Sequence, residues 1–298
     1  MAAQTTLARA VETRGQGLHT AVRCRLRLMP APANTGIVFR RVDLEGFAIE
    51  AHIQNLARVS YATSLMKKGV LLSTVEHLLA ALYASGVDNV FVEVDGLEVP
   101  ILDGSAQPFV ELLTRAGLKQ LRSRRRYLKV LRPVEVRDGD RSIGVFPSDA
   151  FGVRCLIDFA HPCIGRQEIA LTIGPESFQR ELAPARTFGF LEDVDRLRSQ
   201  GLIRGGSLEN AVVLNRDRIL NNGLRFADEF VRHKALDLIG DLALLGRPLK
   251  ALVVAHKAGH ALHTQLVTRL LADRSLWTET TEEPATKRAP RAVSAPAP

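Results

Sequence analysis

The chain has 298 residues, of which 46% are hydrophobic and 24% charged, a globular composition that is long enough for two ordinary domains. Its formal charge of +8 favours an anionic partner without choosing among nucleic acid, an anionic membrane surface and a phosphorylated small molecule. Three widely spaced cysteines argue against a disulfide framework, and the lack of a leader-like segment or an 18-residue apolar run predicts a soluble, cytoplasmic protein.

Strands and helices are both predicted in the first half of the chain. Apolar residues occupy alternate positions of the segment 22–28, with arginines between them, a pattern typical of a half-buried strand. Ser73 and Glu76 have capping-box spacing ahead of an apolar run, which predicts the start of a helix. The other elements expected here are strands at 37–39 and 90–94 and helices at 74–85 and 106–116.

The second half is predicted to repeat this mixture after a domain boundary. Residues 118–127 are basic and show no clear period, so we expect one domain to cover residues 1–126 and another to cover residues 127–278. Strands and helices segregate rather than alternate, which predicts an α+β fold. Residues 279–298 are rich in Pro, Ala, Thr and charge and are expected to form a disordered tail. The elements expected in this half are strands at 127–136, 143–146, 153–159 and 251–255 and a long helix at 228–245.

His233, Asp237 and Asp241 follow one another at intervals of four residues in the longest predicted helix. Residues at this spacing lie on one helical face, here opposite an apolar stripe. A polar stripe of this kind is most often a solvated face. Leu236 beside it indicates partial cover, however, and the neighbouring Lys234 could bind an anion or a developing oxyanion.

A second polar pair, Glu76 and His77, lies near the start of the predicted helix at 74–85. A single histidine on a helix is more often structural, so this pair alone is a weak signal. Together, His77, His233 and Asp237 supply two imidazoles and one carboxylate, a ligand set typical of catalytic zinc with the fourth position left to water. The same set permits iron(II). Because the two helices are far apart in sequence, the site would form between the domains.

Two predicted loops add polar candidates. The segment 257–260 follows an apolar strand and contains a glycine, so His260 is expected to be mobile enough to act as a proton donor, although a surface histidine is the commoner case. In the segment 185–190, Thr187 could donate a hydrogen bond to an oxyanion, as any threonine could. The residues alone therefore indicate a metalloenzyme and do not identify its substrate.

With these segments in view, the sequence closely resembles the UDP-3-O-acyl-N-acetylglucosamine deacetylase family. The matching segments follow the family order to about Trp277, and no single one is decisive. They are 17–20, 31–36, 73–77, 101–105, 185–190, 230–241 and 257–262. The resemblance implies zinc-dependent hydrolysis of the N-acetyl amide of UDP-3-O-(3-hydroxyacyl)-N-acetylglucosamine. The products would be UDP-3-O-(3-hydroxyacyl)-glucosamine and acetate, in an early step of lipid A biosynthesis.

The resemblance also implies two similar α+β domains, each a β-sheet packed on helices, with the helix layers facing each other around the active site. Each domain of the family carries one insert. The first would fall at 60–72, which matches the family poorly, and the second at 190–203. The apolar residues of 190–203, Leu202 among them, would form a passage for the acyl chain. The alternative is that this apolar face packs on its own domain.

The catalytic roles implied by the resemblance fall on residues already described. His77, His233 and Asp237 would hold one zinc ion, and Glu76 would be the general base. A carboxylate base and a cationic acid handle the two proton transfers that amide hydrolysis needs. The remaining positions follow by role: His260 as the protonated acid, Asp241 as its orienting partner, Thr187 as an oxyanion donor and Lys234 beside the polar groups of the substrate.

Four further positions match substrate contacts of the family. Asp158 and Phe159 match positions that contact the uracil, Lys257 matches a cationic position near the phosphates, and Phe188 would pack beside the sugar. The expected partners are therefore the UDP-linked substrate and, transiently, the cytoplasmic membrane face, which attracts basic surfaces. We expect a monomer.

Two other functions are weighed against this one. A metal-dependent deacetylase of another acetylated sugar would not need the apolar segment or the uracil-position pair. A nucleic-acid-binding module would account for the charge, but the basic residues are spread out and no basic stripe carries interleaved aromatic residues.

Overall fold

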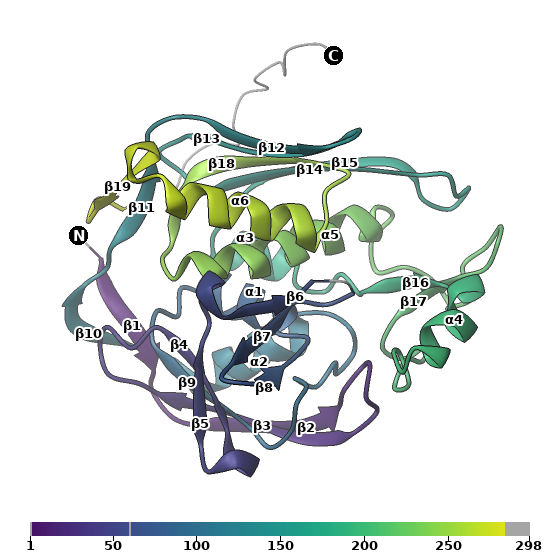
Figure 1. Cartoon of the computed structure of the whole chain (residues 1–298), viewed down its shortest axis with the longest axis horizontal. Helices are drawn as coiled ribbons and strands as arrows, with labels where there is room; N and C mark the ends of the chain where they lie inside the picture. Colours follow the sequence, from purple (N-terminus) through teal and green to yellow (C-terminus); the bar gives the residue numbers. More distant parts are fainter. Residues whose placement is uncertain (1, 60, 284–298) are drawn as a thin grey trace.

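The computed structural model describes residues 2–59 and 61–283, and its fold is of the predicted α+β class. Sheets lie on the two outer sides of the molecule, and helices fill the layers between them (Figure 1). The largest sheet of the first half and that of the second half lie on opposite sides. The helix layers of the two halves therefore face each other, as expected.

Three sheets are built by the first half of the chain. The largest has the strand order β2-β3-β9-β4-β5, strands β6, β7 and β8 form a second sheet, and β1 pairs with β10. The strands are β1 (Ala3–Leu7), β2 (Val11–Gln16), β3 (Arg23–Pro30), β4 (Ile37–Arg41), β5 (Phe47–Glu50), β6 (Leu56–Arg58), β7 (Ser64–Lys67), β8 (Val70–Leu72), β9 (Val90–Val94) and β10 (Leu118–Arg124). Strand β10 occupies the basic segment for which the pattern predicts no element, because neither of its faces is buried.

Strand β3 shows the predicted alternation, since Cys24, Leu26 and Leu28 are buried between outward-facing arginines. The pattern also assigns Val22 to the buried set, and this is wrong. Val22 precedes the strand in a turn closed by a hydrogen bond from the Gly17 N–H to its carbonyl oxygen, and 58% of its surface is exposed.

Helices α1 (Glu76–Ala84) and α2 (Gln107–Ala116) confirm the two helices predicted in the first half. The predicted capping box is wrong, because no side chain caps the first turn of α1. The carboxylate of Glu76 instead accepts a hydrogen bond of 3.1 Å from the backbone N–H of Thr63. The acidic side chain is therefore turned into the interior rather than toward the end of the helix.

A seven-stranded sheet dominates the second half. Its order is β12-β13-β18-β11-β19, with β14 paired to both β18 and β15, while β16 and β17 form a separate pair. The strands are β11 (Tyr127–Val130), β12 (Val134–Asp138), β13 (Arg141–Pro147), β14 (Gly152–Phe159), β15 (Gly165–Thr172), β16 (Phe188–Phe190), β17 (Val212–Leu214), β18 (Leu249–His256) and β19 (Trp277–Thr280). The predicted strands appear as β11 to β14 and β18.

The helices of the second half differ from the prediction at one important place. They are α3 (Pro175–Glu181), α4 (Val194–Ser199), α5 (Glu229–Leu242) and α6 (His260–Ala272). The pattern places His260 in a mobile loop, but it is the first residue of α6, which packs against α5. The error arises because the apolar residues that bury α6 begin only at Leu262. In the described part of the chain, no helix is long and apolar enough to cross a membrane.

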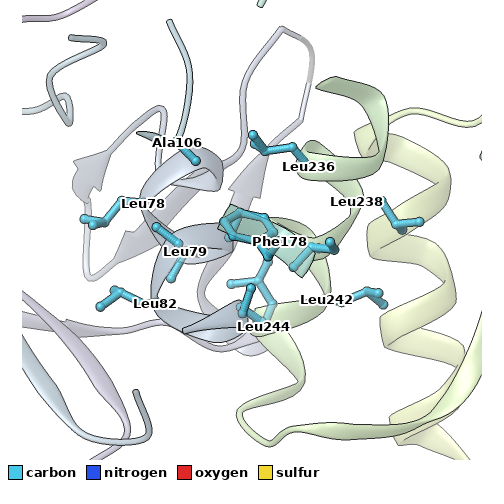
Figure 2. Close-up of a cluster of buried hydrophobic side chains, with 14 of the residues drawn as sticks. Leu78, Leu79, Leu82, Ala106, Phe178, Leu236, Leu238, Leu242 and Leu244 are labelled. Atoms are coloured by element: carbon cyan, nitrogen blue, oxygen red, sulfur yellow. The ribbon is translucent and has the colours of Figure 1, made fainter. Parts of the chain in front are cut away.

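Helices α1 and α5 meet face to face at the centre of the molecule. A Cβ atom on Gly240 of α5 would lie 2.1 Å from the carbonyl oxygen of Glu76, so only glycine permits this approach. Side chains of both halves join one hydrophobic cluster. Figure 2 shows three of them, Leu79 of α1, Phe178 of α3 and Leu242 of α5. Polar groups carried by the facing surfaces of α1 and α5 are thereby removed from water.

The C-terminal end of the described chain is more ordered than predicted. Strand β19 pairs with β11, and Glu279 forms ion pairs with Arg126 and Arg247, so the expected tail cannot begin at residue 279. The rest of that expected tail, residues 284–298, lies outside the described residues. Because β10 belongs to a sheet of the first half and β11 to a sheet of the second, we propose the domain boundary between Arg126 and Tyr127.

Candidate active site

The three predicted metal ligands converge where α1 faces α5. His77 on α1 and His233 and Asp237 on α5 each present one donor atom, and these atoms lie within 4.8 Å of one another. His77 Nε2 is 3.5 Å from Asp237 Oδ1, and His233 Nε2 is 3.3 Å from the same oxygen. All three side chains are buried, so the solvated-face alternative for α5 is excluded. Two imidazole nitrogens and a carboxylate oxygen are a donor set that fits a divalent transition metal.

The orientation of His233 is fixed from the far side of its ring. Its Nδ1 donates a hydrogen bond of 3.0 Å to the carbonyl oxygen of Ala185, which leaves Nε2 directed at Asp237. This is the outer hydrogen bond that metal-binding histidines usually make. The segment around Ala185 is itself held, because the backbone N–H of Arg186 donates to the buried carboxylate of Glu229.

Lys234 completes the charge balance around Asp237. Its Nζ donates a hydrogen bond of 2.7 Å to Asp237 Oδ2 and lies 5.6 Å from the centre of the Phe188 ring. Burial alone would raise the pKa of Asp237, but His233 and Lys234 hold it well below its usual range. The carboxylate is therefore ionised at neutral pH, as a metal ligand must be.

Glu76 lies buried beside this donor set, next to His77 in the chain. Burial raises the pKa of Glu76, while the nearby His260 and His77 act in the opposite direction. A carboxylate with a raised pKa accepts a proton more readily than an exposed one does. Glu76 is therefore a buried carboxylate with a raised pKa beside the donor set.

His260, the first residue of α6, is paired with a buried carboxylate. Its Nδ1 donates a hydrogen bond of 2.7 Å to Asp241 Oδ2, and His263 Nδ1 donates one of 2.9 Å to the same oxygen. Burial alone would lower the pKa of His260, but the charge and hydrogen bond of Asp241 raise it to about 9. Burial would raise the pKa of Asp241, and the two histidines bring it to about 2. Asp241 thus favours the cationic form of the His260 ring at neutral pH.

Phe188, the first residue of β16, and Thr187 just before it approach the donor set. The Phe188 ring lies 6.5 Å from the His233 ring, and the N–H of Thr187 donates to the carbonyl oxygen of Gly104 in the first half. The structure therefore brings this segment to the α1–α5 interface.

Asp158, Phe159 and Lys257 form a neighbouring group at the end of β14. Lys257 Nζ lies 3.3 Å from Asp158 Oδ2 and 3.1 Å from Asp140, and the rings of Phe159 and Phe188 are 5.8 Å apart. Phe159 also borders a cavity of about 370 Å³, which His161, Phe190 and Asn215 help to line. Phe159, which follows Asp158 in the chain, thus lies between the Lys257 ion pair and this aromatic-walled cavity.

The segment 190–203 projects at the side of the molecule, where Figure 1 shows α4. None of the residues in 191–199 is buried, so this apolar face does not pack into the core. Leu202 is half-buried, and the next residue, Ile203, donates its N–H to His19 Nδ1 at 3.4 Å. This bond joins the segment to the first half of the chain.

Comparison with known proteins gives a consistent result. The family model described as UDP-3-O-acyl N-acetylglycosamine deacetylase matches residues 4–272. The chain is 54% identical over 275 residues to the UDP-3-O-acyl-N-acetylglucosamine deacetylase of Solibacter usitatus, with 92% of this chain and 93% of the relative covered. It is 49% identical to the enzyme of the same name from Anaeromyxobacter dehalogenans, with 91% and 88% covered.

The chain belongs to this deacetylase family. The match runs from β1 to the end of α6 and so includes every candidate residue described above. Deacetylases of this name act as amide hydrolases, and the site described above offers such chemistry a buried carboxylate, an imidazole with a raised pKa and a metal-type donor set.

Two residues of the site were not found from the sequence. Thr63 precedes β7 in a segment that matches the family poorly, and its hydroxyl lies 2.5 Å from Asp241 Oδ1. His263 follows His260 by three residues, which places both on one face of α6, and this spacing was the available signal. The carbonyl of Ala185 leaves no trace in a side-chain pattern.

Proposed function

We propose that this protein hydrolyses the N-acetyl amide of UDP-3-O-(3-hydroxyacyl)-N-acetylglucosamine, giving UDP-3-O-(3-hydroxyacyl)-glucosamine and acetate in lipid A biosynthesis. The single observation that best supports this is the convergence of Glu76 and His260 beside one buried His-His-Asp donor set, with His260 Nε2 4.0 Å from Asp237 Oδ2. Membership of the deacetylase family supplies the substrate class.

We propose that His77, His233 and Asp237 hold one Zn²⁺ ion, although their chemistry also suits Fe²⁺. A bound Zn²⁺ lowers the pKa of water to roughly 7 and polarises a carbonyl. The donor set leaves room for both functions, because three protein ligands are typical of catalytic sites and four of structural ones.

The proton transfers follow from the other residues. Glu76 accepts the proton of the attacking water, and His260 gives its proton to the nitrogen of the departing amine as the C–N bond breaks. The charge of His260 and the hydroxyl of Thr187 stabilise the oxygen on which negative charge develops. Asp241 keeps His260 oriented and charged. Lys234 adds a second positive charge beside the acetyl group.

Substrate recognition is assigned to the surface around β14 and β16. Asp158 and Phe159 contact the uracil, Lys257 the phosphates and Phe188 the sugar. The cavity beside Phe159 supports this, as does the pairing of Lys257 with carboxylates that an incoming phosphate would displace. The segment 190–203, which carries Leu202, forms the passage for the acyl chain, and the lack of buried residues in 191–199 supports that role.

The deciding experiment measures acetate release and metal content on the same preparation. Purified protein should contain about one equivalent of metal per chain, lose activity with a chelator and regain it with Zn²⁺ or Fe²⁺. Turnover should be much faster on the 3-O-acylated UDP-sugar than on UDP-N-acetylglucosamine. Equal turnover on both would favour a general sugar deacetylase, and no turnover on either would refute the proposal.

The proposed reaction takes place in the cytoplasm, on a monomer that meets the membrane transiently. Arg14, Arg23 and Arg25 support membrane contact, because they lie exposed on the outer face of β2 and β3 beside a cavity of about 650 Å³. Each basic residue near an anionic bilayer contributes about 1 kcal/mol. Binding to vesicles with anionic lipid, and its loss at high salt, would test this; gel filtration would test the monomer.

A further inference from the structure

Thr63 is the residue through which the first half of the chain reaches the acid–base pair. It lies just before β7 and is fully buried. Its carbonyl oxygen accepts a hydrogen bond of 3.2 Å from the N–H of Val75, next to the start of α1. The backbone of Thr63 is therefore tied to the helix that carries Glu76.

The N–H and the hydroxyl of Thr63 form hydrogen bonds to Glu76 and to Asp241, the partner of His260. Its N–H donates to Glu76 Oε2 at 3.1 Å, and its hydroxyl donates to Asp241 Oδ1 at 2.5 Å. The hydroxyl oxygen also lies 3.2 Å from His260 Nδ1. Thr63 thus contacts the proposed base, Glu76, through its backbone N–H. It contacts Asp241, the carboxylate that pairs with His260, through its side chain.

Counting hydrogens defines what the hydroxyl does. It has one proton, which goes to Asp241 Oδ1, so its lone pairs face the Nδ1–H of His260. Oδ2 of Asp241 already accepts from His260 and His263. Among the described residues, Thr63 is the hydrogen-bond donor to Oδ1. Without it, the buried carboxylate would lack a partner on that oxygen and could rotate away from His260.

We propose that Thr63 is a positioning residue that sets the placement of His260 relative to Glu76 through the rotation of the Asp241 carboxylate. The inference rests on the proposed function, in which Glu76 accepts and His260 donates a proton. Thr63 itself exchanges no proton, and its hydroxyl acts through Asp241 and His260. Its contribution is geometric, and it depends on the hydroxyl rather than on the volume of the side chain.

The test separates hydroxyl from volume with three substitutions. Thr63→Val keeps the shape and removes the hydroxyl, Thr63→Ala removes the hydroxyl and shortens the side chain, and Thr63→Ser keeps the hydroxyl. The first two should lower kcat about 10- to 100-fold with KM within about twofold, because supporting hydrogen bonds at active sites have effects of this size. Thr63→Ser should restore kcat to within about threefold of wild type.

Thr6→Val is a matched control. Thr6 is also a buried threonine, and its hydroxyl donates to a carbonyl oxygen, that of Asn89, at 2.7 Å, far from the site. Melting temperature and metal content are measured for all variants. Thr6→Val should lower the melting temperature and leave kcat unchanged, while the Thr63 variants should keep a full equivalent of metal.

A double-mutant cycle tests whether Thr63 acts through His260. In a His260→Ala background the loss caused by Thr63→Val should shrink to less than about threefold, because the orientation of an absent ring no longer matters. A full additional loss in that background would overturn the inference, and so would wild-type kcat in both Val and Ala variants.

The outcomes distinguish this inference from the function on which it rests. A wild-type protein without deacetylase activity would overturn both. An active wild type that is disabled by Glu76→Ala and His260→Ala but insensitive to loss of the Thr63 hydroxyl would overturn the positioning role alone. The positioning role is supported if kcat falls in Thr63→Val and Thr63→Ala, is restored in Thr63→Ser, and the double-mutant cycle with His260→Ala is non-additive.

Discussion

The facing surfaces of α1 and α5 and the segment 191–199 differ in how firmly they are held. At the α1–α5 interface His77, His233 and Asp237 are buried, and the carboxylate and the His233 ring have defined partners. In 191–199 no residue is buried. Buried polar groups need satisfied partners, so the geometry of the interface is set before substrate arrives. The exposed segment has few such constraints and can adapt to an acyl chain.

This difference shows how one chain can hold its polar site groups in fixed positions and still accommodate a flexible ligand. Proton transfer and carbonyl activation are directional and fail with small displacements. Recognition of a flexible acyl chain relies on the hydrophobic effect, which is non-directional and roughly proportional to buried area. Substitutions at the interface should therefore lower turnover strongly, whereas substitutions in the segment should change only discrimination between substrates.

The largest effect is expected from His233→Ala. Removing one of three metal donors and its hydrogen bond to Ala185 should cause loss of metal and activity together. Metal analysis and acetate release on the same sample measure both, and His256→Ala, whose Nδ1 donates to the carbonyl oxygen of Asp140 outside the donor set, provides a histidine control. A variant with a full equivalent of metal and normal turnover would show that the ligand assignment is wrong.

Glu76→Ala and His260→Ala should each keep the metal and lower kcat, since loss of a positioned acid or base typically costs about 10²- to 10⁴-fold. In the proposed mechanism the proton of His260 is needed, and its pKa is raised to about 9, so wild-type kcat should fall as the pH rises toward that value. A bound cation repels this proton and moves the alkaline limb to lower pH. His260→Ala should abolish the alkaline limb and Glu76→Ala the acidic one, and near-normal kcat in either variant removes that residue from the mechanism.

The same raised pKa affects stability. The pKa of His260 in the folded protein lies above its ordinary value of 6.5. Its contribution to the free energy of unfolding is therefore complete below about pH 6.5 and is lost as the pH rises through about 9. The melting temperature of metal-free wild type should therefore fall across this window more than that of metal-free His260→Ala.

Much of the fold followed from local patterns, and the exceptions share a cause. The alternation in β3, the helices α1, α2 and α5, and the strand β9 are encoded by periodic apolar residues. Strands β10 and β19 were missed because their side chains are largely exposed and their ladders depend on distant partners. Spacing alone identifies polar candidates on one helix, but the meeting of α1 with α5 depends on tertiary packing.

The site shows the same limit at the level of residues. The ligand spacing in α5 was visible in the sequence, whereas the helical setting of His260 and the role of Thr63 were not. Thr63 lies 178 residues from Asp241 in the chain, so its hydrogen bond has no local signature. Residues that act by bridging two halves of a fold are the ones that local patterns cannot reveal.

An intermediate effect is expected in the segment 190–203, which contains the unburied residues 191–199 and the half-buried Leu202. A buried methylene is worth about 0.8 kcal/mol, so even a few that remain effective after ordering the acyl chain would give roughly a hundredfold preference for acylated substrate. Leu202→Asp should erode this preference and leave metal content unchanged, while exposed Leu208→Asp serves as a control. Comparable kcat/KM on both substrates in the wild type would refute the passage.

The smallest effect is expected from truncation of the C-terminal end. Truncation tests whether the α1–α5 interface or the segment 191–199 depends on that end. Deleting 284–298 removes a segment rich in Pro and Ala and should leave kcat and the melting temperature unchanged. Deleting 279–298 also removes part of β19 and the carbonyl of Glu283 that accepts from the buried ammonium of Lys250.

The longer deletion should therefore lower the melting temperature by several degrees, because each lost kcal/mol shifts it by roughly 2–4 °C in a protein of about this size. The ion pairs of Glu279 add little, since they are exposed. Neither deletion should change kcat or the preference for acylated substrate, because β19 lies on the far edge of the sheet, beside β11 and away from α4 (Figure 1). A change in kcat with the shorter deletion would mean that residues 284–298 reach the site, and equal melting temperatures for both deletions would mean that β19 contributes nothing to stability.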